Sequence, residues 1–218
     1  MTTDLNTLTF SVIRAETLAH CLDWWAIYED CFPPSEREPA EVILSSLLAG
    51  KGMAFGAFHN KTVVGISTIH LLEKPAAVFL VYLSLIPEYR GNGIGPAFLD
   101  YIFTAGQTAL SDKGYQSIGN VWEVERPSEA LTAAEKIGRE KRIHFFERNH
   151  ARRLSVNYIQ PPVDGSTCVP MHLMLRSTAD QVDDTDFQIS LARAIYFEKY
   201  EETNKIPHEI LNRLFESL

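Results

Sequence analysis

The sequence lacks the features that mark several common classes of protein. Its 218 residues include only three cysteines, Cys21, Cys31 and Cys168, an odd number whose spacing fits no metal site. Acidic residues outnumber basic ones by 28 to 20, and the net charge of −8 argues against a broad nucleic-acid or anionic-membrane surface. No run of 18 apolar residues and no cleavable signal is expected, since the segment from Met1 to Asn6 is mostly polar. We therefore expect a cytoplasmic protein with reduced cysteines, no metal site, and neither nucleic acid nor membrane as a partner.

What is present suits a globular protein of ordinary size. Hydrophobic residues make up 45% of the chain and aromatic residues 11%, which is enough for a sizeable core. The length fits one domain, or one domain with an appendage. The negative charge mildly favours a cationic or neutral molecule as the partner.

The most informative segment runs from Ala76 to Gly106. Its first part, as far as Ile86, is almost entirely apolar and predicts a strand buried on both faces, which Pro87 ends. A turn with three glycines follows, and the segment after it has the spacing of a helix lying on a sheet, with apolar residues at Phe98, Leu99, Ile102 and Phe103. The order is therefore strand, glycine turn, helix.

This order of elements predicts a binding site for phosphate groups. Glycines let the backbone turn tightly with its N–H groups exposed, and the start of the helix adds unpaired N–H groups and a positive dipole end. The turn lacks the Gly-Lys-Ser/Thr ending of a P-loop, and its glycines do not fit the dinucleotide spacing G-x-G-x-x-G. A phosphate-bearing ligand of another kind is expected, unless the glycines serve only the geometry of the turn.

The residues from Leu85 to Gly95, LIPEYRGNGIG, resemble the pyrophosphate-binding motif of the GNAT superfamily of acyl-CoA-dependent N-acyltransferases. That motif is Arg/Gln-x-x-Gly-x-Gly/Ala, and Arg90, Gly93 and Gly95 match its three fixed positions. The resemblance implies acetyl-CoA as cosubstrate, held by Leu83, Leu85, Arg90, Gly91, Asn92, Gly93, Ile94 and Gly95. It also implies transfer of an acetyl group to a primary amine of a small molecule or peptide, by direct attack.

The remaining elements follow from periodicity and from turn residues. We expect strands at 8–14, 53–58, 63–72, 76–86, 117–125, 154–159 and 169–175. We expect helices at 16–32, 40–49, after Gly95, and at 131–149. In the first helix the positions at helical spacing are Leu18, Leu22, Trp25 and either Tyr28 or Glu29, and in the last the core positions would be Leu131, Ile137, Ile143 and Phe146.

This order of elements is the order that the resemblance implies. The predicted fold is α/β (α+β), a GNAT fold with a mixed central sheet of about seven strands, splayed between strands 4 and 5 and flanked by helices. The transferase domain would span 1–177, and 178–218 would be a C-terminal helical extension with an acidic linker at 178–185. The extension pads the core domain, forms a dimer contact, or supplies a wall of the acceptor pocket.

Acyl transfer to an amine needs a base for the amine and a donor for the carbonyl oxygen. The resemblance places the thioester where strand 4 splays from strand 5, so the backbone N–H of Leu85 is the candidate oxyanion donor. Glu123 and Glu125 lie two residues apart, on one face of strand 5, and are the candidate bases. Crowded carboxylates would raise one pKa toward neutrality. Alternatively this end of the strand is solvated, or Glu123 pairs with an arginine.

The general acid is the point where the sequence departs from the family. The resemblance calls for a tyrosine in the last helix of the domain, and Phe146 stands there instead. Phe146 cannot donate a proton, so the thiolate leaves unassisted, or Tyr158, Tyr82 or His144 serves as donor. The alternative to an enzyme is a catalytically silent acyl-CoA-binding sensor or interaction module.

The acceptor pocket should lie opposite the CoA arm. The stiff segment from Phe32 to Arg37 carries a charged pair, and we assign Phe32, Glu36 and Arg37 to acceptor binding. Glu36 could instead be an exposed partner of Arg37, which would contribute under about 1 kcal/mol.

Overall fold

The computed structural model describes residues 7–163, 167–177 and 183–218. The predictions for the polar residues 1–6, for part of the turn before residue 169 and for most of the acidic linker at 178–185 lie outside the described residues. The strands are β1 (Leu8–Ile13), β2 (Gly52–His59), β3 (Thr62–Glu73), β4 (Ala76–Leu85), β5 (Gly119–Glu125), β6 (Arg152–Arg153), β7 (Ile159–Gln160) and β8 (Val169–Ser177).

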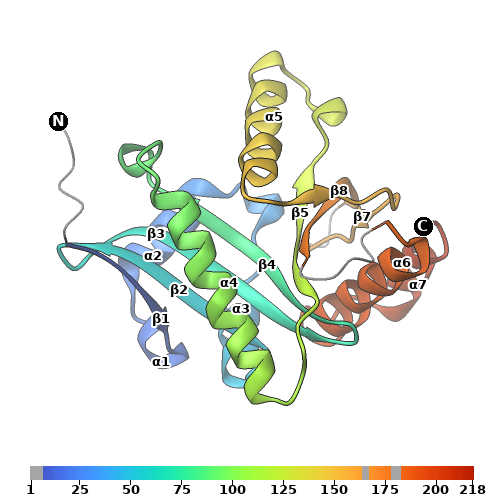
Figure 1. The fold of residues 1–218 in the computed structure, drawn as a ribbon, viewed down its shortest axis with the longest axis horizontal. Coiled ribbons are helices and arrows are strands. Elements are labelled where there is room, and N and C mark those ends of the chain that lie inside the picture. Colours follow the sequence, from blue (N-terminus) through green and yellow to red (C-terminus); the bar gives the residue numbers. More distant parts are fainter. Residues whose placement is uncertain (1–6, 164–166, 178–182) are drawn as a thin grey trace.

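Three helices follow the first strand, single helices follow β4 and β5, and the last helices follow one another at the C-terminal end (Figure 1). They are α1 (Ala15–Leu18), α2 (Leu22–Cys31), α3 (Ala40–Leu48), α4 (Ile94–Asp112), α5 (Ala133–Arg148), α6 (Thr185–Ala194) and α7 (His208–Phe215). A π-helical segment, η5 (Ile195–Glu201), continues α6.

The strands form one mixed sheet in the order β1-β2-β3-β4-β5-β8-β6, with β7 paired to β8. All neighbouring pairs are antiparallel except β4 and β5, which run parallel. The parallel pair is short, because only Val78 to Leu80 of β4 pair with Asn120 to Trp122 of β5. The predicted mixed sheet that opens between its fourth and fifth strands is therefore confirmed.

Helices cover both faces of the sheet (Figure 1). One face packs against α4 and the last turns of α5, with Phe98 and Phe146 among the buried side chains. The other face carries two clusters, one beneath α2 and α3 and one beneath the C-terminal helices. Ile66 belongs to the first cluster and Leu72 to the second; they lie an even number of residues apart on β3 and so share a face.

The predicted helix at 16–32 is wrong as one continuous element. The chain leaves the helix after Leu18 and starts again at Leu22, and the Trp25 indole N–H donates to the Leu18 carbonyl oxygen at 2.8 Å. This break changes which residues face the core. Leu22 is exposed, and Trp24 and Ile27 are buried in its place.

The core positions predicted for the helix at 131–149 are half right. Ile143 and Phe146 are buried, but Leu131 is 91% exposed and Ile137 is 51% exposed. The helix begins with a capping box in which Thr132 accepts from the backbone of Glu135, so Leu131 lies outside it. Only the C-terminal part of α5 reaches the sheet.

The strand predicted at 154–159 is also wrong. Two-residue strands, β6 and β7, lie on either side of an irregular segment. The backbone N–H groups of Ser155 and Val156 donate to the side-chain oxygen of Gln188 in α6, at 2.9 and 3.1 Å. A side chain from the C-terminal helices thus supplies the partner that a strand ladder would otherwise provide.

The C-terminal helices are attached to the sheet by burial and by a charge pair. Leu191, Ile195 and Leu211 are fully buried against β8 and its neighbours. Lys199 pairs with Glu38 at 2.7 Å, and both side chains are only 3% exposed. In the part of the chain that the structure describes, no helix is both long and apolar enough to cross a membrane.

Candidate active site

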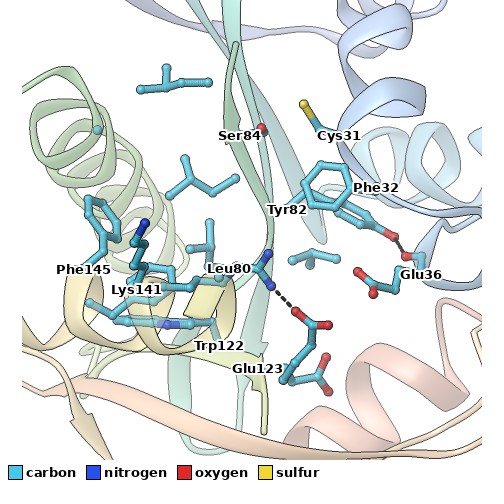
Figure 2. Close-up of a pocket in the computed structure, with 18 of the residues that line it drawn as sticks. Cys31, Phe32, Glu36, Leu80, Tyr82, Ser84, Trp122, Glu123, Lys141 and Phe145 are labelled. Carbon is cyan, nitrogen blue, oxygen red and sulfur yellow. Dashed lines mark hydrogen bonds and ion pairs between the residues drawn. The ribbon is translucent and has the colours of Figure 1, made fainter. Parts of the chain in front are cut away.

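A cavity of about 930 Å³ opens where β4 and β5 diverge (Figure 2). The two strands stay paired as far as Leu80 and Trp122. Val81 is then an extra residue in β4, because the register with β3 shifts there, and such a bulge turns a strand locally. The cavity wall also includes the turn after β4, the inner side of α5, the segment after α2, and Tyr200 of η5.

The turn between β4 and α4 has the geometry of a phosphate site. Gly91 and Gly93 have φ values of +82° and +76°, which glycine adopts without strain, and a Cβ atom at either position would meet no other atom within 4 Å. Gly93 is the N-cap of α4, a helix of 19 residues whose first N–H groups are directed toward this end. Arg90 stiffens the turn, since its Nε donates to the Leu85 carbonyl oxygen at 2.8 Å.

The structure brings most residues of the predicted CoA site to one cavity. Arg90, Gly91, Gly93 and Gly95 line it, as do Leu83 and Leu85 of β4. Two residues of the turn differ. Asn92 is exposed and does not line the cavity, and the Ile94 side chain is only 2% exposed within the core.

The backbone of β4 exposes donors toward the cavity. The Ile86 N–H donates to the Val64 carbonyl oxygen of β3 at 3.0 Å, and Gly65 is the register partner of Leu85. Because N–H directions alternate along a strand, the N–H groups of Leu83 and Leu85 point away from β3, toward the gap beside β5. This direction is the one that a donor to the thioester carbonyl needs.

Glu123 lies on β5 at the centre of the site and is held by neutral donors. Its carboxylate accepts from the Tyr158 hydroxyl at 2.5 Å, from the Tyr200 hydroxyl at 2.8 Å and from the Gln160 amide at 2.6 Å. Burial raises the pKa of Glu123 above its ordinary value, although these three hydrogen bonds oppose the rise. A carboxylate with a raised pKa and no cation bound to it is suited to accept a proton.

Glu125 has a different environment, although it lines the same cavity. Its carboxylate forms ion pairs with Arg139, at 3.1 Å, and with Arg142. The two guanidinium groups already occupy this carboxylate and compensate its charge within the protein. The two candidate bases thus differ, and the arrangement favours Glu123.

Only two of the three residues assigned to acceptor binding lie at the cavity. Phe32 and Glu36 line the cavity, whereas Arg37 does not. Within the described residues no ion pair joins Glu36 to Arg37 and Glu36 is half-buried, so the alternative that Glu36 is an exposed partner of Arg37 is wrong. Burial raises the pKa of the Glu36 carboxyl and nearby Glu125 adds to the rise, while Arg142 and Arg139 oppose it.

The candidate general acids do not offer a free proton donor to the cavity. Tyr158 is fully buried and lies behind Glu123, to which it donates. The Tyr82 hydroxyl is occupied, since it donates to the Glu36 carbonyl oxygen and accepts from the Glu38 N–H. His144 is exposed and does not line the cavity, whereas Phe146 does and packs against Trp122 with ring centroids 4.6 Å apart.

Sequence reasoning missed several residues of the site. Tyr200 and Gln160 bind Glu123, while Glu38 and the half-buried Ser84 of β4 line the cavity (Figure 2). No local pattern could have found them, because Tyr200 lies 77 residues from Glu123 in the chain. Among the residues that the structure describes, no group of three or more histidine, cysteine or acidic side chains could hold a metal ion.

Comparisons with known proteins agree with this geometry. The acetyltransferase (GNAT) family profile matches residues 21–148. A solved structure from Bacteroides thetaiotaomicron, assigned to the GNAT family, has a TM-score of 0.67 and 19% identity, over 91% of this chain and 99% of that one. Arabidopsis thaliana NAA60 in complex with acetyl-CoA has a TM-score of 0.54 and 17% identity, over 79% and 99% of the two chains.

A third solved structure is similar in fold. An aminoglycoside 6'-N-acetyltransferase complexed with coenzyme A has a TM-score of 0.55 and 14% identity, over 78% of this chain and 96% of that one. At these identities the likeness concerns the fold alone. No protein with curated annotation matches the sequence.

Proposed function

The chain belongs to the acetyltransferase (GNAT) family and uses acetyl-CoA as its acetyl donor, and from this premise we propose that it acetylates a primary amine of a small molecule or peptide. The reaction forms a C–N bond, breaks the C–S bond of the thioester and releases one proton from the amine. The observation that carries the proposal is Glu123, a carboxylate with a raised pKa that faces the opening between β4 and β5.

Each part of the site has a role in this proposal. The turn from Arg90 to Gly95 binds the pyrophosphate of CoA through backbone N–H groups and the N-terminus of α4. The Leu85 N–H donates to the carbonyl oxygen, where negative charge develops during attack. Glu123 accepts the amine proton, directly or through a water molecule. Tyr158 and Tyr200 orient Glu123 and hold its charge.

The leaving thiolate needs no protein acid in this scheme. A thiol has an ordinary pKa of about 8.5, so a thiolate is a far better leaving group than an amine. Phe146 then serves as an apolar wall beside Trp122, in place of a proton donor. The absence of a tyrosine at position 146 therefore does not by itself argue against an enzyme. A silent acyl-CoA-binding module would bind CoA through the same turn but would not acetylate an amine.

An assay of CoA thiol release with a panel of primary amines tests the proposal. We expect release above the rate of spontaneous hydrolysis for at least one amine, together with the acetylated product by mass spectrometry. Calorimetry with CoA is the matching control for binding. Tight CoA binding without turnover across a panel that includes diamines, aminoglycosides and peptides would contradict the proposed reaction and favour the silent module.

Three statements about the whole chain stay proposals. The boundary between the transferase domain at 1–177 and the extension at 178–218 is supported by the end of β8 at Ser177. A cytoplasmic location is supported by the three cysteines, all of which are free thiols. A homodimer contact through the C-terminal helices remains a prediction that sedimentation analysis would test.

A further inference from the structure

Four glutamates line the cavity, and two of them are neutralised within the protein. Glu38 pairs with buried Lys199 and accepts a further hydrogen bond from Asn204, at 2.7 Å each. Glu125 pairs with two arginines of α5. Because their charges are compensated, these two carboxylates need no ligand. The remaining two, Glu36 and Glu123, have no cation bound to them in the described part of the chain.

Glu36 is fixed in place by its backbone while its carboxylate is left without a partner. The Tyr82 hydroxyl bridges the segment, since it donates to the Glu36 carbonyl oxygen at 2.8 Å and accepts from the Glu38 N–H at 2.9 Å. No hydrogen bond or ion pair to the Glu36 carboxylate occurs within the described residues. Figure 2 shows this carboxylate directed into the same space that Glu123 faces from β5.

The walls beside Glu36 are aromatic. Phe32 and Tyr82 line the cavity, and their ring centroids lie 4.8 Å apart in an edge-to-face arrangement. An aromatic face attracts an ammonium group, and the attraction is stronger where water is excluded. A half-buried carboxylate next to aromatic rings is the combination that recognises an organic ammonium ion.

Glu123 and Glu36 would interact with different amino groups of an acceptor. Glu123 takes the proton of the attacking amine, so that amine must become neutral. Glu36 lies on the opposite wall, on the segment after α2, and cannot hold the same nitrogen during attack if Glu123 deprotonates it. Arg142 and Arg139 act on the Glu36 carboxylate without binding it, so a ligand that brings its own positive charge would supply the direct partner that this carboxylate lacks.

We propose that the acceptor carries at least two amino groups, one attacking beside Glu123 and a second, protonated one bound by Glu36 against Phe32 and Tyr82. The inference rests on the proposed acetyl transfer and names its substrate class, an aliphatic diamine or polyamine-like molecule. By binding the second ammonium group, Glu36 selects the acceptor and determines how far its attacking amine reaches toward Glu123.

A series of 1,n-diaminoalkanes compared with 1-aminoalkanes of the same chain length tests this inference. We expect kcat/KM for the best diamine to exceed that of its matched monoamine at least tenfold, mainly through KM. In Glu36→Gln the ratio of diamine to monoamine should fall to about one. Glu41→Gln removes the same charge from an exposed position on α3 outside the cavity wall, and should leave both values unchanged.

Equal kcat/KM for diamines and monoamines in the wild-type protein would overturn the inference, as would an equal loss for both amines in Glu36→Gln. A failure of the proposed function has a different signature, in which no amine at all is acetylated. In that case calorimetry of diamines with the CoA-saturated protein decides the inference. Binding that weakens at least tenfold in Glu36→Gln supports it, and identical binding by the two proteins contradicts it.

Discussion

The two halves of the cavity are built in opposite ways. The half that we assign to the cosubstrate is one continuous stretch, in which β4, the turn at Arg90 to Gly95 and the start of α4 expose backbone groups. The half that we assign to the acceptor is assembled from distant segments, with Glu36 after α2, Glu123 on β5 and Tyr200 in η5, and it presents side chains. A binding surface made of backbone atoms keeps its shape through most substitutions around its glycines. A binding surface made of side chains is altered by every substitution within it.

The C-terminal helices make this difference possible. They pack against β8 and bring Tyr200 to Glu123 and Lys199 to Glu38. A π-helix has hydrogen bonds between residues five apart, one more than in an α-helix, and this rare geometry is often found at functional sites. In this protein both side chains come from the same π-helical segment, Ile195–Glu201. The extension is therefore part of the site as well as of the core.

The largest effect should follow loss of the base, which belongs to the acceptor half alone. Glu123→Gln keeps the size of the side chain and removes its basicity, so we expect the acetylation rate to fall about 10² to 10⁴-fold. CoA affinity should stay within a factor of about two. Rate measurements report on the acceptor half and calorimetry with CoA on the cosubstrate half. If acetylation rate and CoA affinity fell together, the two halves would not be functionally distinct.

The pH dependence of the acetylation rate in Glu123→Gln is a second test of the base. The base must be deprotonated, so the rate of the wild-type protein should rise with pH through the pKa of Glu123, which burial raises above its ordinary value. This acidic limb should disappear in Glu123→Gln. If Glu125→Gln removes the limb instead, the base is assigned to the wrong carboxylate.

The next effect concerns the ion pair that joins the acceptor half to the C-terminal helices. Lys199→Met leaves Glu38 buried without its partner, and we expect the free energy of unfolding to drop by about 3–5 kcal/mol. Lys51→Met is the matched control, since it breaks the exposed Lys51–Glu202 pair and should cost under about 1 kcal/mol. Urea denaturation of both variants checks this. Equal losses would show that burial of the pair is unimportant.

In the cosubstrate half, the charge at the turn should decide binding. Gly93→Asp places a carboxylate where phosphate oxygens are expected, and we predict CoA binding at least about 100-fold weaker, or roughly 2.7 kcal/mol. Gly93→Asn places an uncharged side chain of nearly the same size at the same positive φ, so it should weaken CoA binding far less. Calorimetry with CoA measures both. Identical affinities for the two variants would rule out a phosphate at this position.

The smallest effect should come from one donor to the base. Tyr200→Phe removes a hydrogen bond that lowers the pKa of Glu123, so this pKa should rise further and the acidic limb should move to higher pH. Below the limb we expect rates about 3- to 10-fold lower, and above it rates at least equal to wild type. Tyr196→Phe, whose hydroxyl donates to the Ile159 carbonyl oxygen, is the control that should not shift the limb.

How far sequence reasoning reached depends on whether a feature is local. The succession of strand β4, glycine turn and helix α4 was predictable, because these elements are consecutive and each constrains the next, although Asn92 and Ile94 do not line the cavity as expected. The helix at 16–32 and the strand at 154–159 failed for non-local reasons. The Trp25 indole binds the carbonyl oxygen of Leu18, and Gln188 of a distant helix takes the N–H groups that a strand would have used.

By itself, the sequence determined the order of the elements from β2 to β5, the glycine turn before α4 and the position of two glutamates on one face of β5. These depend on periodicity and backbone conformation, which neighbouring residues control. Only the tertiary structure decided which glutamate is free. Glu123 receives neutral donors from Tyr158, Gln160 and Tyr200, while Glu125 receives two arginines of α5. The charge state of a carboxylate depends on what packing brings within a few ångströms of it, and that is set by segments far apart in the chain.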